Sequence, residues 1–409
     1  MNIKSAGIGL GAFAVALGLG WWAIGPDWRA LLSDPPRSND VFELTTEQRT
    51  VAIRMADRVP FIVKKRQVPA GNNVRELPIG DDLKIDLDVE AILKVQHTTG
   101  LVILHKGKIR KEFYDMGFGP RERTLSFSVG KSFMSTLLGA AIQDGYISSV
   151  DQPVTDFIPE LKGSAYDNVT VEHLLTMTSG VQWSEDYDDP ESDFRRWQLQ
   201  LLDKDKKRNK TPIVVSFMKQ LPRRYPPGQE FYYNSAETAL IGILVDRAID
   251  QPMATYLSEK IWKPFGMEDD ANWLLGEDGA EIASGAIMVT TRDYARFGLF
   301  ITEQLKGIGE TIVPQNFLKD GTSYLVKTPG NAGYGYQWWI PEPTDFPDPV
   351  FHAEGVFGQT IFIDPKRDLV IALNSSWPKP NGDRDIHVAR KHFWQAVQKA
   401  IDVESGRMH

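Results

Sequence analysis

The stretch that decides the fold is residues 127–133, FSVGKSF, together with the apolar run behind it. Apolar side chains recur in this run at helical spacing, at Phe133, Met134, Leu137, Leu138 and Ile142. The pattern predicts a helix that begins near Ser128 and that Gly145 ends. A serine therefore stands at the first turn of a long apolar helix.

Ser128 and Lys131 have the spacing that a serine nucleophile and its base require. The first amides of a helix have no intrahelical acceptor and lie at the positive end of the dipole, so the N–H of Ser128 could stabilise an oxyanion. A residue at i+3 lies on the same helical face, so Lys131 reaches the Ser128 hydroxyl. An ordinary lysine, with a pKa of about 10.4, is protonated at neutral pH. Burial behind the apolar helix would lower that pKa and make Lys131 a base.

The Ser-x-x-Lys spacing by itself is a weak signal, because the chain contains it three times. Ser376 is followed by Pro378 and Pro380, which exclude a helix. Ser216 lies inside a predicted amphipathic helix, where its N–H is already bonded. An isolated match is most often a capping serine beside a surface lysine, so the context of Ser128 carries the interpretation.

Two competing motifs are excluded. Residues 130–132, GKS, resemble the end of a phosphate-binding loop, but that loop needs a glycine where the chain has Leu125. The G-x-S-x-G elbow of α/β-hydrolases does not occur in the chain.

The segments around the serine helix predict an α+β domain. Strands are expected near both ends, at residues 101–104, 109–114, 351, 361–363 and 369–373, and the first two form a hairpin. Helices are expected at residues 45–55, 170–177, 235–249, 291–304 and 384–400, with Thr170 and Thr291 as N-caps. Because strands and helices do not alternate, we expect an antiparallel sheet flanked by helices, with a helix-rich middle.

Two further segments hold residues of chemical interest. Residues 227–235, PGQEFYYNS, bring two tyrosines to the start of a helix, and a hydroxyl beside Lys131 would share its proton. Taken alone, Tyr232 and Tyr233 are most often core aromatics. Residues 351–359 hold two glycines in a strand-like stretch, which indicates either close approach of the backbone to a substrate or a bulge.

The composition excludes several functional classes. The chain has 409 residues, a net charge of −8 and no cysteine, so it has no thiol nucleophile, disulfide or thiolate metal site. The seven histidines show no metal-binding spacing, and neither a metal nor a cofactor is expected. The densest basic run, residues 204–210, is short and broken by Asp205, so nucleic acid is not expected as a partner.

The N-terminus predicts a membrane anchor. Residues 6–25 carry no charge and as a helix would be about 30 Å long, the thickness of a bilayer core. Signal-peptide cores are shorter, about 7–15 residues, and Trp21 and Trp22 suit a membrane interface. We favour an uncleaved anchor over a cleaved signal, with Lys4 inside and the rest of the chain extracytoplasmic, in the periplasm of a Gram-negative bacterium.

This organisation gives three regions. Residues 1–25 are the anchor or signal, residues 26–90 a linker and N-terminal extension, and residues 91–409 the hydrolase domain. The linker proper is expected at residues 26–40, which are rich in Pro, Ser and Asp.

Several ordered motifs resemble the serine β-lactamase-like superfamily, in the branch of class C β-lactamases, family VIII carboxylesterases and D-Ala-D-Ala carboxypeptidases. The motifs are FSVGKSF, LLTMTSG at residues 174–180, EDYDDPESD at 185–193, PGQEFYYNS, TTRDYARFGLF at 290–300 and AEGVFGQ at 353–359. Within that branch the chain is most similar to the 6-aminohexanoate-dimer (nylon-oligomer) hydrolases, over residues 92–402.

The resemblance implies a β-lactamase/transpeptidase-like fold and roles for particular residues. It makes Ser128 the acylated nucleophile and Lys131 its base. It aligns Tyr233, rather than Tyr232, with the catalytic tyrosine of the family. It implies an oxyanion hole formed by the backbone N–H groups of Ser128 and Val356.

On the substrate side, the resemblance implies roles for Tyr187, Ser235 and Gly355, and the chain also departs from its pattern. Counting on from Tyr187 places Gln198 where the dimer hydrolases have an acidic residue near the substrate amine. The Lys-Thr-Gly triad of β-lactamases is replaced by residues 353–355, Ala-Glu-Gly, so a β-lactam or peptidoglycan carboxylate loses its cation partner.

The sequence therefore predicts a serine hydrolase that cleaves a small carboxylic ester or a linear amide through an acyl-enzyme. Two alternatives stay open. One is a peptidoglycan-directed D-Ala-D-Ala carboxypeptidase or weak β-lactamase, and the other is an anchored binding protein without catalytic activity. The physiological substrate and the oligomeric state are not predicted.

Overall fold

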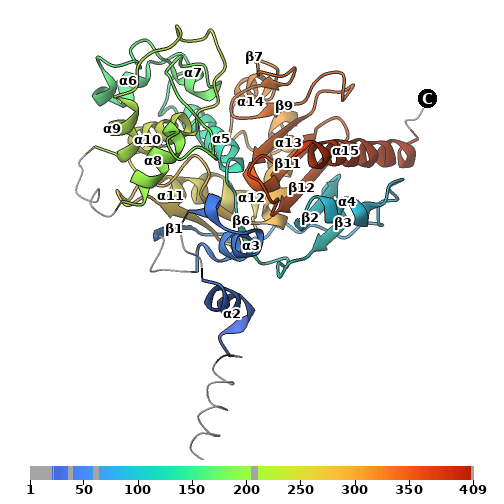
Figure 1. Cartoon of the computed structure of the whole chain (residues 1–409). Coiled ribbons are helices and arrows are strands. Elements are labelled where there is room, and N and C mark those ends of the chain that lie inside the picture. Colours follow the sequence, from blue (N-terminus) through green and yellow to red (C-terminus); the bar gives the residue numbers. More distant parts are fainter. Residues whose placement is uncertain (1–20, 22, 36–39, 59–63, 204–210, 407–409) are drawn as a thin grey trace, which may run out of the picture.

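The computed structural model describes residues 21, 23–35, 40–58, 64–203 and 211–406. Figure 1 shows a half built on a large antiparallel sheet and, beside it, a half that consists mostly of helices. The helix α5 (Val129–Gln143), which follows Ser128, is buried between them and contributes thirteen buried residues to the core.

The large sheet has eight strands in the order β3-β2-β12-β11-β10-β9-β8-β7, all antiparallel. The strands are β2 (Thr98–His105), β3 (Lys108–Tyr114), β7 (Val326–Lys327), β8 (Gly333–Tyr334), β9 (Trp339–Ile340), β10 (Phe351–Gly355), β11 (Gln359–Asp364) and β12 (Leu369–Ser375). The expected hairpin of β2 and β3 and the three C-terminal strands are confirmed. Strands from both ends of the domain meet where β2 pairs with β12.

Side chains alternate between the two faces of this sheet. On β2, Leu101 and Ile103 belong to the cluster that includes Phe393 and Val397 of α15 (Arg384–Glu404). The intervening Val102 and the following Leu104 belong to the larger cluster, shared with α5 and with α13 (Thr291–Lys306). The sheet is therefore buried on both faces, with α15 on one face and α13 and α5 on the other.

The remaining helices lie mostly in the second half and around α5. They are α4 (Val89–Val95), α6 (Val154–Phe157), α7 (Val171–Leu175), α8 (Asp193–Leu201), α9 (Ile213–Met218), α10 (Ser235–Ile249), α11 (Met253–Leu257), α12 (Lys263–Phe265) and α14 (Gln315–Gly321). The expected helices at residues 170–177 and 235–249 are confirmed as α7, with Thr170 as its N-cap, and α10. Contacts between α10 and α5 join the helical half to the serine helix.

A second, four-stranded sheet was not predicted from the sequence. Its order is β1-β5-β6-β4, with β1 (Lys64–Val68), β4 (Arg123–Leu125), β5 (Ala271–Leu275) and β6 (Ile287–Thr290). Its strands are short and come from distant parts of the chain, so no local pattern marks them. Its strand β4 leads directly into Ser128 and α5.

Three expectations about the N-terminal part and the caps have different outcomes. The helix at residues 45–55 is confirmed as α3 (Thr46–Met55). The linker expected at residues 26–40 is wrong for its first part, because residues 25–33 form the helix α2 (Gly25–Ser33), with proline at its start, where a missing N–H costs nothing. The cap of α13 is Thr290 rather than Thr291, since the Thr290 side chain accepts from the N–H of Asp293.

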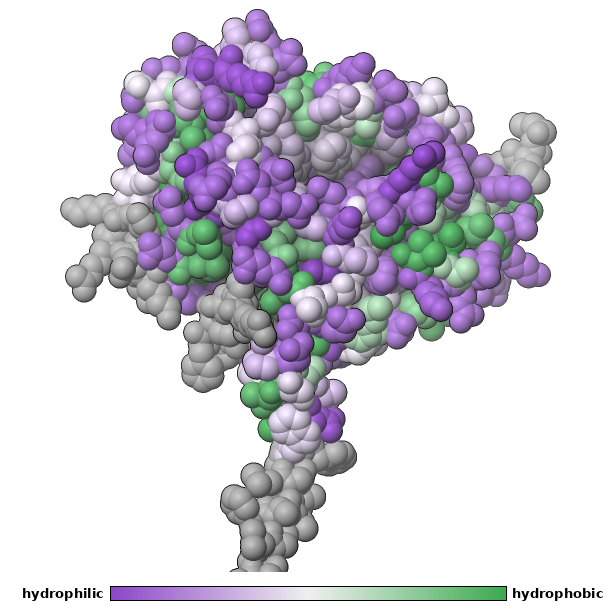
Figure 2. All heavy atoms as spheres, viewed as in Figure 1, coloured by the Kyte–Doolittle hydropathy of each residue, from purple (hydrophilic) through white to green (hydrophobic). Residues whose placement is uncertain are grey.

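The 20-residue apolar run lies almost entirely outside the described residues, as does the basic run at 204–210. In the parts of the chain that the structure describes, no helix is long and apolar enough to cross a bilayer. Figure 2 shows apolar residues on α2, below the main body of the molecule. An ion pair between Arg54 of α3 and Asp27 ties α2 to the domain.

Candidate active site

A sharp turn between β4 and α5 presents Ser128. Phe127 has a φ of 43°, in the left-handed region that side chains seldom adopt. Ser126 holds this turn, because its N–H donates to Ile287 O at 2.9 Å and its Oγ donates to Phe127 O at 3.0 Å. Strained backbone persists where its surroundings over-determine it, and such places are often functional. Ser128 stands at the N-cap position of α5.

The amine of Lys131 is buried and in contact with the serine. The Lys131 side chain is 2% exposed. Its Nζ lies 2.8 Å from Ser128 Oγ, 2.9 Å from Ser235 Oγ and 2.9 Å from Ser284 O. Burial lowers the pKa of Lys131 to about 8, against the opposing charge of Glu185. A substantial fraction of the amine is therefore neutral near physiological pH.

The hydrogen-bond partners of Lys131 determine whether its amine can present a lone pair to Ser128. Ser284 offers a carbonyl oxygen, which can only accept. The Ser235 hydroxyl donates its one hydrogen to a carboxylate oxygen of Glu185, so it too must accept from Lys131. A neutral amine has two N–H groups and one lone pair. With both N–H groups engaged, the lone pair faces the hydroxyl of Ser128, as a general base requires.

Tyr233, and not Tyr232, joins this group. Tyr233 is half-buried, its ring centroid lies 5.1 Å from Lys131 Nζ, and it stacks on Trp339 at 5.7 Å. Burial is the main cause that raises the pKa of Tyr233, assisted by the charge of Glu185, while hydrogen bonds with Ser128 and Ser235 oppose the shift. Tyr233 is therefore protonated at neutral pH and suits a proton donor. Tyr232 is 38% exposed.

Glu185 is a carboxylate at the centre of the site that the sequence reasoning did not identify. It accepts from the N–H of Ser235 at 2.7 Å, from the Ser235 hydroxyl, from Trp183 Nε1 at 2.8 Å and from the hydroxyl of Tyr187 at 3.0 Å. These four donors satisfy both of its oxygens. Its position two residues before Tyr187, in the EDYDDP segment, was the one signal available, and nothing in that spacing distinguishes it from the acids around it.

The backbone around residues 355–358 fits the expected oxyanion hole. A Cβ at Gly355 would lie 2.6 Å from Ser126 O and 3.0 Å from Ser128 N, so only glycine permits this close approach. Among the described residues, neither the N–H of Ser128 nor that of Val356 donates to a protein acceptor. Two unoccupied donors beside a nucleophile are the arrangement that stabilises a tetrahedral oxyanion.

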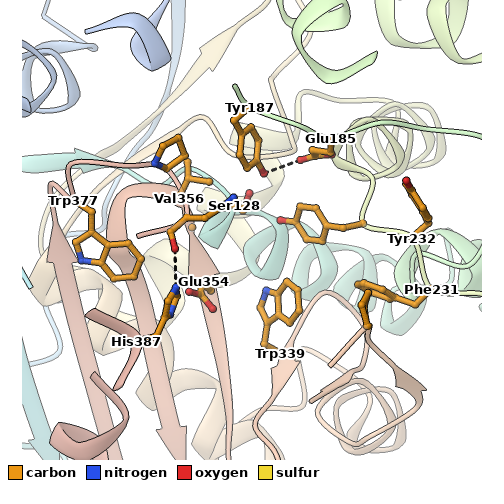
Figure 3. Close-up of a pocket in the computed structure, with 15 residues that line it drawn as sticks. Ser128, Glu185, Tyr187, Phe231, Tyr232, Trp339, Glu354, Val356, Trp377 and His387 are labelled. Atoms are coloured by element: carbon orange, nitrogen blue, oxygen red, sulfur yellow. Dashed lines mark hydrogen bonds between the residues drawn. The ribbon is translucent and has the colours of Figure 1, made fainter. Parts of the chain in front are cut away.

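Two cavities meet at Ser128. The larger, with a volume of about 530 Å³, is aromatic and acidic; Figure 3 shows Ser128 within it, with Tyr187 and Glu185 on one side and Trp339 and Glu354 on the other. The smaller, of about 210 Å³, is lined mainly by apolar side chains. Tyr187 borders both cavities, whereas Ser235 and Gln198 border only the smaller one.

The larger cavity is lined by two carboxylates, Glu185 and Glu354, and by one histidine, His387. Glu354, in the segment that replaces Lys-Thr-Gly, lines it, and Arg390 of α15 donates to Glu354 at 2.6 Å. His352 lies 3.2 Å from the other carboxylate oxygen of Glu354. Arg390, His352 and their hydrogen bonds hold the pKa of Glu354 far below its usual range, although burial alone would raise it. Among the described residues that line this cavity, none is Lys or Arg.

Comparison with known proteins agrees with this geometry. The sequence profile of the family described as Beta-lactamase matches residues 89–392. Among curated proteins, the chain is 27% identical to a 6-aminohexanoate-dimer hydrolase from Paenarthrobacter ureafaciens over 379 residues, which cover 89% of this chain and 94% of that protein. It is 23% identical to a β-lactamase from Pseudomonas fluorescens over 198 residues, 45% of this chain and 49% of that one.

The solved structures show the same fold. A structure described as "Putative 6-aminohexanoate-dimer hydrolase from Bacillus anthracis" superposes with a TM-score of 0.75, at 23% identity, over 90% of this chain and 99% of that one. The α+β architecture predicted from the sequence, with antiparallel sheets flanked by helices, is thereby confirmed. The roles of individual residues are not tested by these likenesses.

The lowered pKa of Lys131 predicts how activity depends on pH. Below about pH 8 most of the amine is protonated and has no lone pair, so kcat/KM for a nitrophenyl ester should rise with pH and level off above about 8. The measurement is a pH profile from about pH 6 to about pH 10, corrected with Ser128→Ala for uncatalysed hydrolysis. A flat profile, or a midpoint in the range of histidine, would contradict Lys131 as the base.

Glu185→Gln should change the same profile in a particular direction. The charge of Glu185 raises the pKa of Lys131, so removing it should move the midpoint to lower pH. The amide that replaces the carboxylate has one acceptor oxygen instead of two and cannot satisfy all four donors, so the plateau should also fall by about tenfold or more. The matched control is Asp186→Asn, which changes the neighbouring, exposed acid. An unchanged midpoint in Glu185→Gln, or an equal shift in the control, would show that Glu185 does not act on Lys131.

Proposed function

The chain belongs to the Beta-lactamase family of serine hydrolases, and we propose that it cleaves small carboxylic esters or linear amides through an acyl-enzyme on Ser128. The observation that carries the proposal is the buried amine of Lys131, whose Nζ lies 2.8 Å from Ser128 Oγ and 2.9 Å from both Ser235 Oγ and Ser284 O. A capping serine beside a surface lysine would need neither the burial nor the orientation.

Acylation follows from this arrangement. Ser128 Oγ attacks the carbonyl carbon while its proton passes to Lys131 Nζ, and the carbonyl oxygen becomes an oxyanion between the N–H groups of Ser128 and Val356. The tetrahedral intermediate then collapses with cleavage of the bond to the leaving group. Tyr233 gives that group its proton and regains one from Lys131, so the pair acts as a unit.

Deacylation repeats the steps with water as the nucleophile. The restored Lys131 and Tyr233 pair takes a proton from water, which attacks the acyl carbon of the Ser128 ester. The second tetrahedral intermediate uses the same two N–H groups. It collapses as the proton passes from the pair to Ser128 Oγ, which releases the free acid and restores Ser128. No metal or cofactor takes part in these steps, because the proton relay and the oxyanion donors supply the chemistry.

The charge around the larger cavity supports an ester or a linear amide over a β-lactam or peptidoglycan peptide. Substrates of the latter kind bring a carboxylate, which needs a cation. Here it would meet Glu185 and Glu354, and the nearby Arg390 is already paired with Glu354. The alternative of a non-catalytic binding protein is opposed by the connected Ser128, Lys131 and Ser235 arrangement, which a scaffold has no physical need to maintain.

The relative from Paenarthrobacter ureafaciens is named for hydrolysis of a 6-aminohexanoate dimer, and a linear amide of that kind is a candidate substrate. Gln198 replaces the acid expected near its amine, which weakens the case for that dimer. Esters are therefore the first substrates to test.

We also propose that residues 6–25 anchor the protein in a membrane with the domain on the extracytoplasmic side. The support is the uncharged run in the sequence and the apolar side chains exposed at its C-terminal end: Trp21 is 44%, Trp28 38% and Leu32 57% exposed. Tryptophan at this position suits the interface between lipid and water.

The acyl-enzyme is tested by intact-mass spectrometry. The chain beginning at Pro26 is mixed with a short-chain nitrophenyl ester beside Ser128→Ala. We expect a transient acyl mass and nitrophenol turnover in the wild type and neither in the variant, whose hydrolysis should be lower by at least about a thousandfold. No adduct and no turnover in either protein would favour the binding-protein alternative, and stable labelling by a fluorescent penicillin would favour the peptidoglycan-directed one.

The anchor is tested by fractionation. The full chain should remain with membranes in alkaline carbonate and dissolve in detergent, whereas the chain beginning at Pro26 should stay in the supernatant. Mass measurement of the membrane-bound protein should include residue 1. A soluble product that lacks residues 1–25 would instead establish a cleaved signal, and a soluble full-length product would exclude an anchor.

A further inference from the structure

The smaller cavity at Ser128 is the least charged part of the site. It is lined by Val41, Phe42, Leu125, Phe127, Phe194, Trp197, Leu201, Leu202, Leu274, Leu275, Ile282, Ala286 and Val356, together with three serines, Tyr187, Gln198 and Gly285. None of these described residues carries a charge. The larger cavity, in contrast, is bordered by Glu185 and Glu354. The two halves of a substrate that spans Ser128 therefore meet different chemistry.

The position of Tyr233 decides which half enters which cavity. The leaving group must take a proton from Tyr233, and Tyr233 lines the larger cavity and not the smaller one. Ser128 and Val356, which bind the acyl carbon and the oxyanion, line both. The leaving group therefore departs into the larger cavity, and the acyl chain extends into the smaller one.

A segment from before the family match forms part of the wall of this acyl cavity. The short helix η1 (Val41–Glu43) brings Phe42 over it, and the Phe42 ring stacks on Tyr187 at 5.1 Å and lies 5.7 Å from the rings of Phe194 and Phe357. This contact places aromatic surface along the acyl chain.

The charged side chains near this wall form an ion pair with one another outside the cavity. Asp40 is buried in an ion pair with Arg195 of α8. Gln198 Nε2 donates to Asp40 Oδ1 at 3.4 Å, which turns its amide nitrogen toward the pair. A chain end inside the cavity can thus meet the neutral Gln198 side chain but no free carboxylate or cation among the lining residues. An ammonium or carboxylate at that end would lose its hydration without meeting an opposite charge, because the carbonyl oxygen of Gln198, which is buried and has no hydrogen-bond partner among the described residues, is a neutral acceptor.

From this juxtaposition we propose that the protein is selective for short, uncharged aliphatic acyl groups, joined to a neutral or cationic leaving group, with Phe42 and Ala286 as specificity-determining residues. The proposal rests on the acyl-enzyme function above. A cavity of about 210 Å³ is below the roughly 300–1,000 Å³ of typical ligand sites, so the acyl chain is short. The acidic, aromatic larger cavity accepts a neutral or cationic leaving group and repels an anionic one.

The test compares nitrophenyl esters that differ only in the acyl group: acetate, butanoate, hexanoate and 6-aminohexanoate. Each buried methylene contributes about fourfold in kcat/KM, so butanoate should exceed acetate by about tenfold or more. The neutral hexanoate should exceed 6-aminohexanoate by at least about tenfold, because the ammonium must be desolvated. Equal rates across the series, or preference for the amino chain, would overturn the proposal.

Two variants change the cavity in opposite directions. Ala286→Leu places a larger side chain in the cavity wall and should lower the hexanoate-to-acetate ratio of kcat/KM by about tenfold. Phe42→Ala removes an aromatic ring from the wall and should raise the octanoate-to-butanoate ratio of kcat/KM. Leu199→Ala is the matched control, because Leu199 lies on the same helix as Gln198 but is 56% exposed and borders neither cavity. Its ratios should equal those of the wild type.

The outcomes separate this proposal from the one on which it rests. If no ester yields an acyl mass on Ser128, the proposed function itself fails. If acetate gives an acyl-enzyme, but the kcat/KM ratios do not change with chain length or in either cavity variant, only the acyl-cavity assignment is wrong. Should Ala286→Leu fail to fold, Phe42→Ala still decides the question, since it truncates a side chain at the cavity's outer wall.

Discussion

The chemistry of this protein depends on keeping one lysine amine out of water. Outside a protein the amine of Lys131 would be protonated and could not act as a base. Burial is what lowers its pKa to about 8, and burial requires that α5 be covered on nearly all sides. The large sheet covers α5 through β10, and the helical half covers it through α10. The two halves of the fold therefore serve a single desolvated group between them.

The second constraint is orientation, and it works partly against the first. Glu185 fixes the Ser235 hydroxyl so that Lys131 must donate to it. The same carboxylate charge raises the pKa of Lys131 and opposes the effect of burial. Four donors, two of them from Ser235, hold this carboxylate in place. Glu185 therefore leaves the pKa of Lys131 less lowered than burial alone would, but it orients the lone pair of the amine toward Ser128.

The local sequence pattern was sufficient to predict the serine helix but not the residues and strands that surround it. The apolar spacing after Ser128 located α5, and the i+3 rule placed Lys131 correctly, because both depend on neighbouring residues. The choice between Tyr232 and Tyr233 came from the family resemblance, and burial of Tyr233 agrees with it. Glu185 escaped prediction because its role depends on Ser235, fifty residues away. The same reason hides the four-stranded sheet, whose short strands pair across the whole chain.

Substrate choice within such a fold is decided by charges that the catalytic group does not need. Ala353 stands where the Lys-Thr-Gly triad has its lysine, and the neighbouring Glu354, paired with Arg390, lines the larger cavity. These differences leave Ser128 and Lys131 untouched, yet they change what the larger cavity can hold. On the other side, the Asp40 and Arg195 pair lies behind Phe42, so the wall that faces the acyl chain is apolar. In the mechanism that we propose, Tyr233 protonates the leaving group, so the larger cavity holds the leaving group and the smaller one the acyl chain. The position of a single proton donor therefore assigns each cavity its half of the substrate.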